Sequence, residues 1–129
     1  MRLLLDTQVW LWLQTTPERI SRATSKRIAD PEAELLLSTA SAWEIAIKYG
    51  LGKLPLPVPP EEYVPSRLRM SKTEPLAIRL DHVLRVATLP HKHRDPFDRL
   101  IVAQAKLEGL PIVTADAVFG EYEVEIVRA

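Results

Sequence analysis

The chain of 129 residues contains no cysteine, and its 17 basic and 17 acidic residues leave a formal net charge of zero. Without cysteine, a disulfide scaffold, a thiolate zinc site and a cysteine nucleophile are excluded. The neutral balance does not indicate a nucleic-acid binder, because such proteins usually carry an excess of basic residues. Any affinity for a polyanion must therefore come from a local patch of charge.

Long apolar runs are missing as well. No segment approaches the roughly 18 to 20 apolar residues that a membrane-spanning helix needs. Arg2 precedes an apolar stretch, as in a signal peptide, but Asp6 interrupts that stretch and no small-residue cleavage site follows. We therefore expect a soluble, cytoplasmic protein.

The length is typical of one domain, and a hydrophobic content of 47% is sufficient for a compact core. Short apolar runs predict strands over residues 1–5, 34–38, 74–78, 110–116 and 122–127. Periodicity and capping residues predict helices over residues 7–14, 21–31, 39–52, 61–69, 81–88 and 96–109. Because strands and helices alternate, we expect one domain over residues 1–129, an α/β sandwich with a mostly parallel sheet flanked by helices.

In such folds chemistry gathers at the C-terminal ends of the strands, and Asp6 lies at the end of the first one. A carboxylate near a core costs several kcal/mol unless something pairs with it. One interpretation is an N-cap for the helix that begins at Thr7. The other is a site residue whose partner comes from elsewhere in the chain.

Two further acids have similar alternatives. Glu44 could form an i, i+4 ion pair with Lys48 on a solvent-exposed face of its helix. The helix around it is apolar on most sides, however, which makes an exposed position for Glu44 less favoured. Asp116 follows the strand that contains "PIVT", where an aspartate often serves a turn or a cap. Thr114, two residues earlier, could donate a hydrogen bond to a neighbouring carboxylate.

The segment "RDPFDR" supplies the last two acids. Proline favours the first helical position, so Pro96 makes Asp95 the N-cap and places Asp98 at the third helical position. Asp98 could complete a capping box there, but one acid is enough to cap a helix. We therefore assign Asp95 to a structural cap and Asp98 to chemistry.

A parallel sheet would bring the acids of these segments together, namely Asp6, Glu44, Asp98 and Asp116. Two carboxylates about 5 Å apart repel each other by about 3 kcal/mol at an effective dielectric constant of about 20. Four such groups would not stay ionised together without a cation. Oxygen ligands without cysteine or a paired histidine motif suit Mg²⁺ or Mn²⁺, so we predict a site for one of these ions.

Four blocks of the sequence, "LLLDTQVWLWL", "SAWEIAIKYGLGKL", "HRDPFDRLIVAQA" and "IVTAD", occur in this order. Together they resemble the PIN-domain ribonucleases, in particular the VapC-like toxins of toxin–antitoxin modules. The likeness extends from Leu3 to Asp116. It implies a single PIN-like domain, a three-layer sandwich with an acidic pocket at one edge of a parallel sheet.

By this resemblance the four acids of the family fall on Asp6, Glu44, Asp98 and Asp116. The resemblance also implies Mg²⁺ or Mn²⁺, an RNA substrate, a homodimer and an antitoxin bound across the active site. From the site itself we expect the cation to be held by Asp6, Asp98 and Asp116 and to activate a water for attack on phosphorus. Glu44 would orient that water or complete a second metal site, and Thr7 and Thr114 are candidates to support the ligands by hydrogen bonds.

Basic residues surround the start of the last helix: His91, Lys92, His93 and Arg94 before it and Arg99 after Asp98. They form either a solvated loop or a local phosphate patch, with Lys92, Arg94 and Arg99 as the contacts. The histidines lack the HExxH spacing of a zinc protease.

The three tryptophans, Trp10, Trp12 and Trp43, are expected in the core or an interface rather than as platforms for bases. Two of them lie within Val9–Leu13. This apolar density, together with the resemblance, predicts that the protein self-associates.

Two other functions remain open. The first is a metal-dependent phosphatase or DNA nuclease, although "DTQVW" lacks the second aspartate of the dehalogenase pattern DxDx[TV] and no adjacent acid pair typical of receiver domains is present. The second is a non-catalytic interaction module with a PIN fold, against which the four intact acids count. A small upstream reading frame encoding a DNA-binding antitoxin would favour the toxin.

Overall fold

The computed structural model describes residues 1–129 and is built around a five-stranded sheet in the order β3-β2-β1-β4-β5. The strands are β1 (Arg2–Leu5), β2 (Glu34–Ser38), β3 (Thr73–Leu76), β4 (Ile112–Thr114) and β5 (Ile126–Arg128). Every neighbouring pair is parallel. The prediction of an α/β sandwich with a mostly parallel sheet is confirmed.

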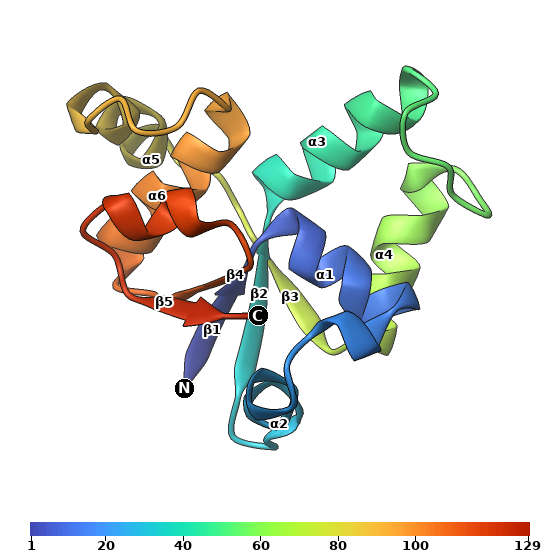
Figure 1. Ribbon diagram of the computed structural model, residues 1–129. Coiled ribbons are helices and arrows are strands. Elements are labelled where there is room, and N and C mark those ends of the chain that lie inside the picture. Colours follow the sequence, from blue (N-terminus) through green and yellow to red (C-terminus); the bar gives the residue numbers. More distant parts are fainter.

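Helices cover both faces of this sheet (Figure 1). One face carries α1 (Thr7–Thr15), α2 (Arg22–Ala29), α3 (Thr39–Gly50) and α4 (Pro60–Met70). The other carries α6 (Pro96–Glu108), with α5 (Leu80–Arg85) packed against it. Short 3-10 turns occupy Pro17–Arg19, Val86–Thr88 and Ala117–Glu121.

The apolar run at the start of the chain fills both cores. Leu3 and Leu5 point to the α1–α4 side and pack with Trp10, whereas Leu4 points to the α6 side and packs with Ile101. This alternation follows from the two-residue period of a strand. A central strand with helices on both faces therefore needs consecutive apolar residues, which Leu3, Leu4 and Leu5 supply.

Only part of Val9–Leu13 is open to solvent. Val9 and Trp10 are fully buried, whereas Leu11, Trp12 and Leu13 are partly buried and pack against the same core. The apolar side chains that do face solvent include Trp43 and Ile47 on α3 and Leu51 at its C-cap, spaced four residues apart along one side of the helix. No helix has the length and apolar character needed to cross a membrane.

The topology also explains where the acids meet. β1 lies between β2 and β4, so the residues that follow these three strands emerge side by side at one edge. The backbone N–H of Asp6 donates to the carbonyl of Val113 at 2.9 Å, which ties the end of β1 to that of β4. A strand was predicted over residues 122–127, but β5 begins only at Ile126. Tyr122 packs in the α6-side core instead of extending the strand.

Candidate metal centre

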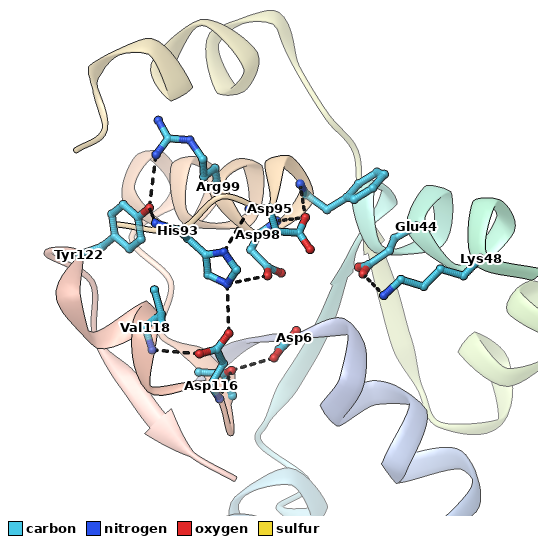
Figure 2. Close-up of polar contacts among 12 residues, drawn as sticks. Asp6, Glu44, Lys48, His93, Asp95, Asp98, Arg99, Asp116, Val118 and Tyr122 are labelled. Carbon is cyan, nitrogen blue, oxygen red and sulfur yellow. Dashed lines mark hydrogen bonds and ion pairs between the residues drawn. The ribbon is translucent and has the colours of Figure 1, made fainter. Parts of the chain in front are cut away.

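The four acids singled out in the sequence line one cavity of about 500 Å³. Asp6 follows β1, Glu44 lies on α3, Asp98 is in the first turn of α6, and Asp116 follows β4 (Figure 2). Asp95 and two lysines, Lys48 and Lys53, line the same cavity.

Asp6 occupies the N-cap position of α1, but its side chain makes no capping hydrogen bond. It accepts a hydrogen bond from the hydroxyl of Thr114 at 2.7 Å instead, as the sequence suggested for that threonine. Asp6 is only 7% exposed, and burial raises the pKa of its carboxyl group, with further contributions from the charges of Glu44 and Asp116. An ionised Asp6 carboxylate without a cation partner is therefore energetically unfavourable at this position.

Glu44 combines both interpretations of its sequence context. Its Oε2 atom pairs with Lys48 Nζ at 2.7 Å, which is the expected i, i+4 contact, and this hydrogen bond raises the pKa of Lys48. Yet Glu44 is only 5% exposed, and its Oε1 atom has no hydrogen-bond partner. An unpaired buried oxygen is costly, so the lysine alone does not account for this side chain.

Asp95 and Asp98 differ in their surroundings. Asp95 Oδ1 accepts hydrogen bonds from the backbone N–H groups of Phe97 and Asp98 at 2.8 and 3.4 Å, so it caps α6. Asp98 caps nothing. Burial, then the charges of Asp95 and Asp6, raise the pKa of Asp98 to about 7.

Asp116 is the most open of the four acids, with its side chain 39% exposed. Its Oδ1 atom accepts from the backbone N–H of Val118 at 3.0 Å and so caps the following 3-10 turn. Its Oδ2 atom lies 3.1 Å from His93 Nε2. The turn interpretation is correct for one oxygen, and the other faces the acidic cluster.

His93 was not singled out from the sequence as part of the acidic cluster. Its Nε2 atom lies 3.0 Å from Asp98 Oδ2 as well as 3.1 Å from Asp116 Oδ2 (Figure 2). The available signal was its place two residues before the N-cap Asp95, which brings it to the same strand edge as the acids. Lys48 and Lys53 were also missed as cations of the cavity.

Arg99 was predicted to contact phosphate, and the structure contradicts this prediction. It is 8% exposed, and its guanidinium donates to the carbonyls of Pro90, Val86 and Leu89 and to the hydroxyl of Tyr122. These bonds hold the loop before α6, so the side chain is not free to bind a phosphate. Lys92 and Arg94 are exposed and line a neighbouring hollow with His91.

Thr7 also differs from expectation. Its hydroxyl donates to Ser41 Oγ at 2.7 Å, and no carboxylate accepts from it. Thr7 therefore joins α1 to α3 beneath the cavity rather than supporting an acid directly. Of the two threonines, only Thr114 holds a carboxylate of the cluster.

The buried groups of the cluster fit a hard divalent cation. Asp6 and Asp98 both have raised pKa values, for which burial is the largest cause, and Glu44 Oε1 lacks a partner. A cation in this cavity would compensate the mutual repulsion of the carboxylates, and Asp98 and Asp116 already place one oxygen each within 4.8 Å of the other. The acidic cluster is thus consistent with metal binding.

A parallel α/β sandwich with carboxylates gathered at one edge of its sheet defines a class of protein, the α/β proteins with an acidic cluster consistent with metal binding. A family model described as the PIN domain matches residues 3–125. The chain therefore belongs to the PIN domain family, and the family resemblance seen in the sequence is confirmed.

Among known proteins, the chain is similar to ribonuclease VapC16 of Mycobacterium tuberculosis, with 54% identity over 55 residues. That match spans 43% of this chain and only 38% of the relative.

Solved structures share the whole fold. VapBC2 from Rickettsia felis, bound to a promoter DNA fragment, matches 99% of this chain and 98% of that chain, with a TM-score of 0.72 and 17% identity. VapBC-1 from nontypeable Haemophilus influenzae has the same coverage and identity and a TM-score of 0.68. A toxin–antitoxin complex from Klebsiella pneumoniae matches 97% of this chain and 95% of that chain, with a TM-score of 0.60 and 18% identity. At these identities the likeness shows the fold.

Proposed function

We propose that this chain is an endoribonuclease that depends on Mg²⁺ or Mn²⁺ and acts as the toxin of a toxin–antitoxin module. The observation that carries the proposal is the convergence of Asp6, Glu44, Asp98 and Asp116 on one cavity in a PIN-domain chain. Similarity to a ribonuclease VapC supports RNA as the substrate.

Asp6, Asp98 and Asp116 would hold the cation, with Glu44 as a fourth carboxylate. When bound, such an ion lowers the pKa of a coordinated water and neutralises charge on a phosphate. Thr114 fixes Oδ2 of Asp6 and leaves Oδ1 for ligation. Glu44 Oε1, which has no partner in the protein, is suited to accept a hydrogen bond from the attacking water.

The cations around the cavity are proposed to contact the RNA backbone. Lys48 and Lys53 line the cavity itself, and the Lys48 side chain is 52% exposed although it pairs with Glu44. Lys92 and Arg94 line the adjacent hollow, which reaches the acidic cluster through His93. Such contacts would position an RNA strand without reading its sequence. They would give a chain of zero net charge a local positive patch.

A cognate antitoxin and a second copy of the chain are the proposed partners. A solved structure of the same fold is a toxin–antitoxin complex, which supports the first. The exposed apolar side of α3, formed by Trp43 and Ile47 and continued by Leu51 at the C-cap, supports the second. We also propose that residues 1–129 form a single PIN-like domain and that the protein acts in the cytoplasm.

The alternatives are a non-catalytic interaction module and a hydrolase of DNA or phosphate monoesters. The unpaired oxygen of Glu44 and the pKa of Asp98, raised to about 7, count against a module, because buried acids without a role are costly. No observation favours DNA or a monoester over RNA.

The proposal is tested by incubating the purified protein with total RNA, with and without Mg²⁺ or Mn²⁺, and mapping the new ends. We expect cleavage only with the metal, loss of cleavage in Asp98→Asn, and full activity in Glu61→Gln, whose acid is exposed on α4 outside the cavity. Cleavage that persists in Asp98→Asn would contradict the assigned site. Hydrolysis of DNA or of a phosphate monoester in place of RNA would support the alternatives.

A further inference from the structure

His93 lies between Asp98 and Asp116 and has no role in the function proposed above. Its Nε2 atom lies 3.0 Å from Asp98 Oδ2 and 3.1 Å from Asp116 Oδ2. Its side chain is 18% exposed. These three residues each offer one donor atom, all within 4.8 Å of one another, which is the spacing of a three-ligand metal site.

The other ring nitrogen argues against ligation. The backbone N–H of Asp95 donates a hydrogen bond to His93 Nδ1 at 3.1 Å, so Nδ1 presents a lone pair. A neutral imidazole then carries its proton on Nε2. Histidines that bind metals show the reverse pattern, in which the second nitrogen donates its N–H to an oxygen. The Nε2 atom that faces the acids is therefore a donor.

The surrounding structure holds His93 in this orientation. Its backbone N–H donates to the hydroxyl of Tyr122 at 2.9 Å, and Tyr122 also accepts from Arg99 at 3.3 Å. The ring meets Phe119 edge-on, with centroids 5.9 Å apart. The buried Arg99 thus helps to fix the loop that carries His93.

We propose that His93 is a positioning residue, an Nε2–H donor that orients Asp116 and holds it beside Asp98, and not a ligand of the metal. The proposal rests on the metal-dependent function above. Asp116 is the most exposed acid of the cluster and needs this support: Val118 fixes one of its oxygens and His93 fixes the other. Both oxygens keep a lone pair for a cation.

Two substitutions separate donor from ligand. Glutamine at position 93 can place an amide N–H near the Nε2 position, whereas asparagine keeps an acceptor near Nδ1 but is too short to reach Asp116. We expect His93→Gln to retain most of the Mn²⁺ affinity measured by calorimetry without RNA, and His93→Asn to lose about 10- to 100-fold. His91→Gln, at an exposed histidine of the same loop, serves as the control and should bind as the wild type does.

Spectroscopy supplies readouts that do not depend on RNA cleavage. In metal-free protein at about pH 8, where free histidine is neutral, ¹⁵N spectra should show His93 as the Nε2–H tautomer. Pulsed electron paramagnetic resonance of bound Mn²⁺ should show no coordinated imidazole nitrogen. An Nδ1–H tautomer, a nitrogen coupling lost in both His93 variants, or unchanged Mn²⁺ affinity in His93→Asn would each overturn the proposal. If RNA is not cleaved but the Mn²⁺ series behaves as expected, the nuclease function is wrong and the role of His93 is supported.

Discussion

The hydroxyl of Thr114 donates a hydrogen bond to Asp6 Oδ2 at 2.7 Å, although the two residues are 108 positions apart in the sequence. The same hydroxyl oxygen accepts from the backbone N–H of Asp116 at 3.0 Å. One threonine at the end of β4 therefore orients two acids of the cluster. The contact exists because β1 and β4 are parallel neighbours that end at the same edge.

Replacing Thr114 by valine keeps the shape of the side chain and removes this hydroxyl. We expect Thr114→Val to lower the free energy of unfolding by about 1 to 3 kcal/mol, because a buried acceptor loses its donor. Urea denaturation measures the change. Thr114→Ser, which keeps the hydroxyl, is the control, and equal stability of the two variants would show that the bond contributes nothing.

Asp95 and Asp98 should respond to alanine in opposite ways. Asp95→Ala removes the cap of α6, so we expect a loss of about 1 kcal/mol in stability and retention of most RNA cleavage. Asp98→Ala removes a buried acid whose pKa is raised to about 7, so cleavage should be lost while the stability of the metal-free protein stays the same or rises. Thermal unfolding and the cleavage assay report both effects, and the reverse pattern would invert the assignment of the two acids.

The stability of the metal-free protein should depend on pH through Asp98. Its pKa is about 7 in the folded protein, against an ordinary value of 3.8, so between these values the folded state binds a proton that the unfolded state does not. This contribution to stability is therefore fully present below the ordinary pKa of 3.8, is lost as the pH rises from there to about 7, with a limiting slope of about 1.4 kcal/mol per pH unit, and does not change further at higher pH. Burial raises the pKa of Asp6 in the same direction.

This pH dependence is measured by urea denaturation between about pH 5 and pH 8. Asp98→Asn should flatten the slope, because asparagine does not titrate. Saturating Mn²⁺ should also reduce it, since the cation competes with the proton for the same carboxylate. A slope that is unchanged in Asp98→Asn would place the titration on other groups.

The sequence predicted the fold and the four acids because both depend on local patterns. Strand runs, helix periods and the Asp95–Pro96 cap are set by residues near one another, and parallel topology then places Asp6 and Asp116 at one edge. The roles of His93 and Arg99 depend on contacts with Asp116 and Tyr122, more than 20 residues away. From the sequence alone, a basic residue in the segment "HKHRDPFDR" is expected to be exposed. Only the fold shows that Arg99 is buried and donates to Tyr122 and to backbone carbonyls, which is why it was wrongly predicted to contact phosphate.

Self-association should involve the exposed side of α3. Trp43, Ile47 and Leu51 are 57%, 38% and 63% exposed, and a second copy would bury them. We expect sedimentation at micromolar concentration to show a dimer, and Ile47→Asp to shift it toward monomer. Val58→Asp, at a residue of similar exposure in the connector before α4, should leave the dimer intact, and a wild type that stays monomeric would contradict the homodimer.

A substitution at Asp6 tests the proposed metal centre most directly. Asparagine has the same size, can still occupy the N-cap position of α1 and can accept the Thr114 hydrogen bond, but it carries no charge. Asp6→Asn should therefore fold normally, and in metal-free buffer it should be at least as stable as the wild type, because a buried carboxyl with a raised pKa is removed.

The difference should appear when Mn²⁺ is added. A cation that binds only the folded state raises the melting temperature, by an amount that grows with the ratio of its concentration to the dissociation constant. We expect Mn²⁺ to stabilise the wild type and the control Asp30→Asn, whose acid lies in an exposed turn, but not Asp6→Asn, which should also fail to cleave RNA. If Asp6→Asn gains as much stability from Mn²⁺ as the wild type and still cleaves RNA, then Asp6 only begins the first helix, and the carboxylates at this edge do not form the metal centre.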